Sequence, residues 1–136
     1  MKSIKVLIAG ILLSGVVGGG ESFGATAPRT SRTDSGGGVT VKATYLDSKG
    51  TDDLRFQLVL DTHSVNLDSY DLKTISVLRD DAGNTYLPTA VENKGSGHHR
   101  EATVSFAKIA NGTKRVELMV KDVAGVQERV FRWELD

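Results

Sequence analysis

The chain has 136 residues, which is the size of one folded domain. Its 17 basic and 17 acidic residues give a formal net charge of zero, which excludes the broad positive field behind non-specific binding to nucleic acid or anionic lipid. It contains no cysteine, which excludes disulfides, thiolate metal centres, iron–sulfur clusters and a cysteine nucleophile. Any partner must therefore be recognised by a local surface.

Residues 1–24 are predicted to be a secretory signal peptide. Lys2 and Lys5 precede an apolar segment over residues 6–17, which is shorter than the roughly 20 residues of a membrane-spanning helix. Cleavage is expected near Gly20 or Gly24, and an uncleaved N-terminal anchor is the alternative. The mature protein is therefore expected to be secreted or periplasmic, with no stable membrane span after cleavage.

Residues 25–38 are predicted to be a flexible linker. The segment consists mainly of Thr, Ser, Arg, Asp, Pro and Gly, and it ends in three glycines. Such a composition buries too little apolar surface to offset the entropy lost on ordering. The folded domain is therefore expected to span residues 39–136.

From Val39 onward, hydrophobic residues recur with a spacing of two, which is typical of strands with one buried face. Turn residues such as Gly83 separate the strands, and Pro88 favours a sheet edge because it donates no backbone hydrogen bond. The pattern predicts an all-β antiparallel sandwich of the immunoglobulin or fibronectin type III kind, with Trp133 in its core. An up-and-down barrel is the alternative. The seven predicted strands cover residues 39–45, 54–61, 73–79, 85–91, 102–106, 116–121 and 131–135.

All three histidines are expected where strands meet loops. Imidazole is a ligand for copper, zinc, nickel and iron, and a site without thiolates would need carboxylate oxygen as well. His98 and His99 would point to opposite faces of an extended backbone, so both could bind one ion only if the turn at Gly97 bends them together. The predicted metal ligands are His63, His98, His99 and Asp61, with Asp68 and Glu101 as further oxygen donors and copper or zinc as the ion.

The same residues also fit a purely structural role. A histidine at a strand end often bonds a neighbouring carboxylate, and an ion pair between Asp61 and Arg100 would join the same two loops. The sequence leaves both interpretations open. The charged segment 122–129 is expected to form the rim of the last hairpin, as a candidate interface.

Three segments carry a resemblance to known proteins: LDTHSVNLD at 60–68, GHHRE at 97–101 and VAGVQERVFRW at 123–133. With them the chain resembles a group of small exported bacterial and archaeal proteins, some joined to heavy-metal-associated modules, over nearly the whole of residues 39–135. Ser96 stands where another glycine would be expected. The resemblance implies a secreted sandwich and favours metal binding. It implies no catalytic residue, because the group has no established activity.

We expect the protein not to be an enzyme. Asp61, His63 and Ser64 have the residue types of a hydrolase triad, but they are too close in sequence for its relay, and no Gly-x-Ser-x-Gly turn is present. The expected function is that of an exported, non-enzymatic binding module that binds either a partner or a transition metal ion through the loop end that carries His63, His98 and His99. The alternative is a structural or adhesive domain that contacts a cell-envelope protein without metal. Nucleic acid is not an expected partner.

Overall fold

The computed structural model describes residues 31–46 and 53–135, so the predicted signal peptide lies outside the described residues. Strands dominate the described chain, with two short helical segments, η1 (Leu67–Ser69) and α2 (Leu72–Ile75). The strands are β1 (Ser31–Gly36), β2 (Val39–Leu46), β3 (Leu54–Thr62), β4 (Ser76–Asp80), β5 (Thr85–Tyr86), β6 (Ala90–Ser96), β7 (His99–Phe106), β8 (Arg115–Val123) and β9 (Val126–Glu134).

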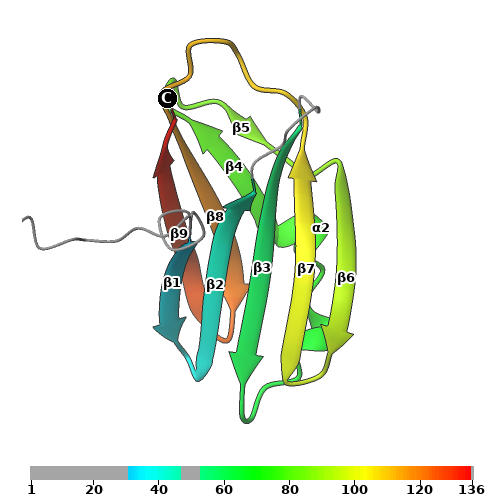
Figure 1. Ribbon diagram of the computed structural model, residues 1–136. Helices are drawn as coiled ribbons and strands as arrows, with labels where there is room; N and C mark the ends of the chain where they lie inside the picture. The colour runs from blue at the N-terminus through cyan, green and yellow to red at the C-terminus, as the bar shows by residue number, and fades with distance from the viewer. Residues whose placement is uncertain (1–30, 47–52, 136) are drawn as a thin grey trace, which may run out of the picture.

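The strands form two antiparallel sheets that pack face to face (Figure 1). The front sheet has five strands in the order β1-β2-β3-β7-β6, and the back sheet has four in the order β5-β4-β8-β9. This arrangement confirms the predicted all-β, antiparallel, two-layer architecture. No helix of the described residues is long and apolar enough to cross a membrane.

The core lies between the sheets and follows the predicted alternation. Phe56, Leu58 and Leu60 of β3 are fully buried, and Leu118 of β8 is buried on the inner face of the back sheet. The Trp133 ring is only 3% exposed and its centroid lies 5.0 Å from that of Phe56, which confirms its place in the core.

The predicted linker is wrong from Ser31 onward, because Ser31–Gly36 forms strand β1. It pairs with β2 over its whole length, from Ser31 opposite Thr44 to Gly36 opposite Val39. The two-residue turn between them has positive φ at both glycines, 65° and 79°, as a tight hairpin requires. A polar edge strand is held by backbone hydrogen bonds to its neighbour and needs no apolar side chains. Its amino-acid composition can therefore resemble that of a linker. Residues 25–30 lie outside the described residues.

Several predicted strand boundaries also change, and the last strand, β9, begins at Val126, five residues before the predicted start. The predicted strand 85–91 is two strands in different sheets, β5 and β6, and Pro88 lies in the connection between them. The first residues of the predicted strand 73–79 belong instead to the single turn of α2. Asp71 caps this turn, because its side chain accepts a hydrogen bond from the backbone N–H of Lys73 at 3.1 Å. Strand β7 begins at His99, three residues before the predicted start.

Arg129 joins the two sheets at the end of the molecule where the β1–β2 and β8–β9 turns lie. Its fully buried guanidinium donates to the carbonyls of Gly36 (2.7 Å), Val39 (3.3 Å) and Val123 (3.1 Å), and pairs with Asp34 at 2.9 Å. The predicted charged rim over 122–129 is therefore wrong at Arg129. Strand alternation turns this residue inward together with Phe131 and Trp133.

Candidate functional site

The predicted metal ligands lie at one end of the sandwich, which we call the histidine end. Asp61 near the end of β3 is opposite His99 at the start of β7. Their side chains share a hydrogen bond between Asp61 Oδ1 and His99 Nδ1, and they remain 53% and 62% exposed. The structure therefore brings these two predicted ligands together on the outer face of the front sheet.

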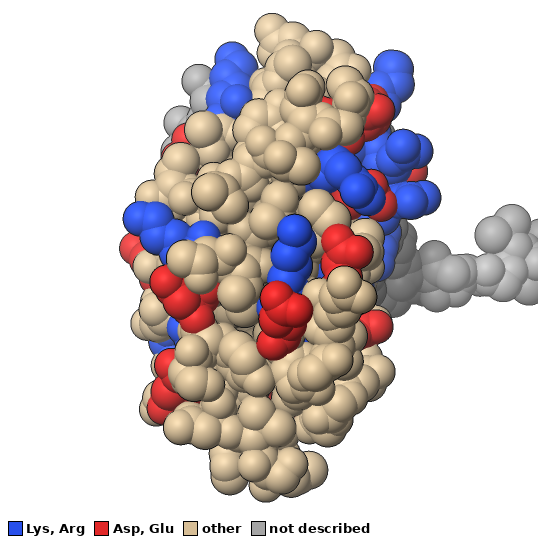
Figure 2. All heavy atoms as spheres, turned by 180° about the vertical axis from the view of Figure 1, so that it is seen from behind, with Lys and Arg blue, Asp and Glu red and all other residues tan. Residues whose placement is uncertain are grey.

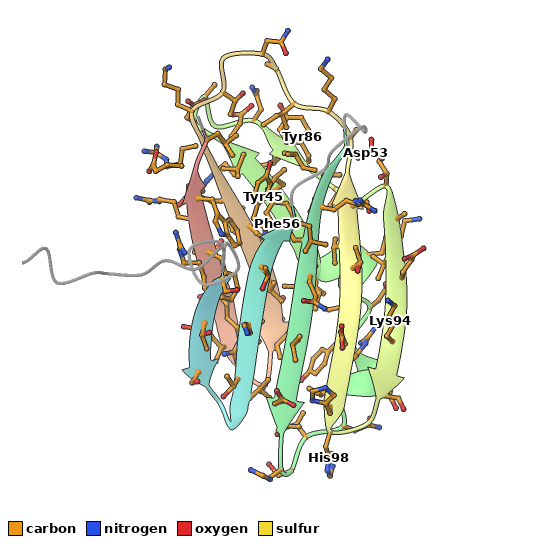
Figure 3. The ribbon with its side chains drawn as sticks, viewed as in Figure 1. Tyr45, Asp53, Phe56, Tyr86, Lys94 and His98 are labelled. Carbon is orange, nitrogen blue, oxygen red and sulfur yellow. The ribbon has the colours of Figure 1, made fainter. Side chains whose placement is uncertain are left out.

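The other two histidines do not join this pair. His98 occupies the β6–β7 turn at the tip of the histidine end, where its side chain is exposed (Figure 3). Its carbonyl accepts a hydrogen bond from the backbone N–H of Thr62 at 2.9 Å. His63 follows β3 in an exposed bend, and its side chain makes no hydrogen bond to the described residues.

Backbone and side-chain hydrogen bonds fix the loops at this end. The Leu67 N–H donates to the Gly97 carbonyl at 3.1 Å, and the Gly97 N–H donates to Asp68 Oδ1 at 2.9 Å. Asp68 thus anchors the turn that carries His98. This contact supports a structural role for the loop residues.

The proposed ion pair between Asp61 and Arg100 is wrong. In the register of β3 and β7, Arg100 lies opposite Leu60 and so points inward, while Asp61 points outward. The buried Arg100 guanidinium donates to the carbonyls of Leu67, at 2.8 Å, and of Tyr70. It therefore ties the front sheet to the η1 segment instead of to Asp61.

The four predicted ligands do not form one metal site. In residues 31–46 and 53–135, no group of three or more His, Asp or Glu side chains is placed to hold a metal ion. Protein sites for zinc normally use three or four such ligands. The structure supplies two, Asp61 and His99, at the predicted position.

A second cluster lies on the outer face of the back sheet. Arg79 of β4, Glu117 of β8 and Arg132 of β9 are direct cross-strand neighbours, and we call them the arginine row. Glu117 accepts hydrogen bonds from Arg79 at 2.9 and 3.1 Å and from Arg132 at 3.0 and 3.3 Å. Each carboxylate oxygen therefore receives two bonds from one guanidinium.

Both arginines favour the charged form of Glu117. The hydrogen bond from Arg132 is the main cause that lowers the pKa of Glu117 below its ordinary value of 4.5, and the hydrogen bond and charge of Arg79 add to it. Burial opposes this shift without reversing it. Glu117 is thus held as an anion between two cations.

Sequence reasoning missed the arginine row because the row depends on strand register. Alternation alone predicts that Glu117 and Arg132 face outward, but it does not show which residues of β4 and β9 lie opposite Glu117. The usable signal was the pair of charged residues at alternate outward positions near the end of the last strand, Arg132 and Glu134.

Comparison of the chain with protein-family models, with curated proteins and with solved structures finds no match. The resemblance to small exported proteins therefore stays a prediction. The histidine end and the arginine row are therefore the two features of the molecule that bear on its function.

Proposed function

We propose that the chain is an exported, non-enzymatic binding domain that contacts a cell-envelope protein through a sheet surface. The arginine row is the observation that carries this proposal. One carboxylate braces two guanidinium groups, which remain 40% and 58% exposed on an open sheet face. Arginine is enriched at protein interfaces because its planar fork makes several directed hydrogen bonds with little further loss of freedom once it is braced.

We further infer that the sandwich is of the immunoglobulin class, with one strand added. When strands are counted from β2, the orders β2-β3-β7-β6 and β5-β4-β8-β9 correspond to A-B-E-D and C′-C-F-G. Strand β1 then extends the A-B-E-D sheet. This connectivity supports the assignment, and domains of this architecture commonly present their sheets and loops to partners.

Export is supported by the order of basic and apolar residues over the first 24 positions. A secreted or periplasmic location would place the sheet surfaces within reach of envelope proteins. The absence of cysteine means that packing and buried hydrogen bonds, such as those of Arg129, hold the exported fold.

Photocrosslinking in the producing cells tests the proposal. A benzophenone amino acid is placed singly at Val130 on the back sheet, at Lys94 on the β6 edge and at His98 on the histidine end. We expect a discrete adduct with one envelope protein from Val130, with the other two positions as matched controls. No adduct from Val130, with or without adducts from the two control positions, would overturn the proposed function.

Metal binding is the second candidate function, and the exposed Asp61–His99 pair is the observation that favours it. Titration of the purified mature protein with copper and zinc, with His63→Ala and His99→Ala as variants, separates the two candidates. Binding tighter than about millimolar that is lost in His99→Ala would favour metal. Metal binding weaker than about millimolar, or metal binding that is unchanged in both variants, would favour a purely structural role for the histidines.

A further inference from the structure

The arginine row keeps unused hydrogen-bond donors on its solvent side. Arg79 and Arg132 each use Nε and Nη2 to bind Glu117. A guanidinium has five N–H groups, so each arginine keeps its two Nη1 donors, which have no partner among the described residues. The side chain of Glu117 is only 10% exposed. An approaching ligand would therefore meet the cations, while the carboxylate that orients them is covered.

The charge around the row is also positive. Arg115 lies two residues from Glu117 on the same face of β8, and Arg32 of β1 reaches the carbonyl of Arg132 with its Nε at 3.2 Å. Figure 2 views this side of the molecule and shows Lys and Arg side chains gathered toward one edge. Three arginines thus lie beside two glutamates on this face: Arg79, Arg115 and Arg132 beside Glu117 and Glu134. Such a surface favours an anionic group.

An apolar row runs beside the arginine row. It consists of Val77, Met119 and Val130, which are cross-strand neighbours on β4, β8 and β9. Met119 is only 3% exposed, so the accessible part of the row is Val130 and the half-buried Val77. Val130 is 45% exposed and is one of the two large hydrophobic residues that the described surface exposes most, with Leu87. Contact with aliphatic groups would remove this surface from water.

The spacing of the two rows matches an extended peptide. Adjacent rows on one face of a sheet are two residues apart, which is about 6.6 to 6.8 Å along a strand. Alternate side chains of an extended chain have the same spacing. A ligand that places a carboxylate on the arginine row would therefore place its side chain two residues away on the apolar row.

We propose that this face binds an extended segment of a partner protein in which Asp or Glu stands two residues from Val, Ile or Leu. This inference rests on the proposed function and names the chemistry of its partner. The apolar row distinguishes such a peptide from a purely anionic polymer, which would gain nothing from Val77 or Val130. The carboxylate would accept hydrogen bonds from the free Nη1 groups of Arg79 and Arg132.

An array of immobilised heptapeptides tests the inference with the purified mature protein. Each peptide carries Glu or Asp at its third position and an aliphatic residue at its fifth. Matched controls replace the acid by its amide or the aliphatic residue by Ser. We expect binding to the acidic–aliphatic peptides that falls about tenfold or more in both control sets, as loss of a charge-assisted hydrogen bond or a buried aliphatic group implies.

Variants of the protein assign the binding to this face. Arg79→Ala with Arg132→Ala should abolish binding, and Arg132→Lys should weaken it about tenfold, because lysine keeps the charge but loses the fork. Lys121→Ala removes one positive charge from the same face beyond the apolar row and should change affinity less than about twofold. Unfolding midpoints confirm that every variant is folded.

Three results would overturn the inference. They are equal binding of the acidic and amide peptides, equal affinity of the double variant and the parent, and a heparin-type polysaccharide or a second copy of the chain as the only ligand that depends on the arginines. If array binding fails while the photocrosslink at Val130 persists, the peptide inference is wrong and the proposed function stands. If no crosslink forms at Val130, both fail.

Discussion

Arg129 shows how a charged side chain is accommodated inside this sandwich. Its guanidinium lies where the β1–β2 hairpin meets β9, and it is bonded mainly to backbone carbonyls. Buried carbonyls need donors, and a guanidinium supplies several from one position. Arg129 therefore stabilises a junction that the surrounding polar strand β1 could not hold by apolar packing.

Replacing Arg129 by Met should destabilise the fold strongly. The carbonyls of Gly36, Val39 and Val123 would lose a donor, so we expect a loss of about 3 kcal/mol in the free energy of unfolding. Arg132→Met is the matched control on the exposed face of the same strand and should cost less than about 1 kcal/mol. Urea unfolding measures both, and equal losses would contradict the role given to Arg129.

Gly37 is required for a close approach as well as for its backbone conformation. It has φ 65°, and a Cβ built on it would lie 2.3 Å from the carbonyl oxygen of Ala124 in the β8–β9 turn. Gly112 has φ 85° with no atom within 4 Å of its built Cβ, and thus isolates the conformational effect.

Gly37→Ala should therefore be worse than Gly112→Ala. We expect Gly112→Ala to cost about 1 kcal/mol from the left-handed conformation and Gly37→Ala to cost about 2 kcal/mol more from the contact with Ala124. Thermal or urea unfolding gives the difference. Similar stabilities for the two variants would show that the hairpin can move away from the β8–β9 turn.

The histidine end illustrates what a sequence can and cannot predict at this scale. The approximate positions of His63, His98 and His99 at strand ends are visible in the alternation pattern, and Asp61 does meet His99. Whether His99 or Arg100 lies opposite Asp61 depends on the pairing register of β3 with β7, and a shift of one residue would exchange the two. Arg100 therefore could not be assigned to the interior from its neighbours alone.

Strands β4, β8 and β9 of the back sheet have an inner and an outer face with different contacts. Their inner face supplies Leu78, Leu118 and Phe131 to the core. Their outer face carries the arginine row and the apolar row side by side. One strand thus stabilises the fold with alternate residues and offers the others for contact.

The arginine row should make stability depend on acid pH. Because the pKa of Glu117 is lower in the folded protein, the unfolded chain binds more protons as the pH falls, and the contribution of Glu117 is lost as the pH drops through its folded pKa, below 4.5. Glu117→Gln should flatten the fall in urea midpoint between neutral and acid pH. An unchanged pH profile in this variant would contradict the row as described.

Part of the loss of stability at acid pH should persist in Glu117→Gln. Although burial raises the pKa of Asp80, hydrogen bonds from Asn84 and Tyr86 and from the backbone N–H groups of Asn84 and Ala82 lower it more strongly. Asp80→Asn combined with Glu117→Gln is therefore expected to have a flatter profile than either single variant. The two carboxylates belong to different faces of the back sheet and have different hydrogen-bond partners.

At the element level, alternation predicted the strands that have one apolar face. It succeeded for β2, β3, β8 and β9, whose inward residues are Val, Leu, Phe and Trp. It failed for β1, which buries no large apolar residue, and for β6, which is an exposed edge. Polar edge strands carry no such pattern because their partner provides only a backbone ladder.

Across the whole molecule, the histidine end and the outer face of the back sheet have different roles. The histidine end is tied by hydrogen bonds among β3, η1 and the β6–β7 turn. The back-sheet face keeps donors and an apolar row available to a partner. The all-β sandwich was predictable from the spacing of hydrophobic residues, but the location of the contact surface required the pairing of strands.

Export predicts a defined mature N-terminus. The basic and apolar residues of the first 24 positions should direct secretion, after which cleavage should leave a chain that begins between Glu21 and Pro28. Intact-mass spectrometry of material from the extracellular or periplasmic fraction measures this end. A chain that retains Met1 and stays in the cytoplasm would contradict the proposed location.

The central claim is that the arginine row and the apolar row together form the contact surface. Amide chemical-shift mapping of the ¹⁵N-labelled mature protein, titrated with an acidic–aliphatic heptapeptide, tests it most directly. We expect the largest shifts at residues 77–79, 115–119 and 130–132. Shifts confined to residues 61–64 and 97–99, or no shifts at millimolar peptide, would contradict the claim.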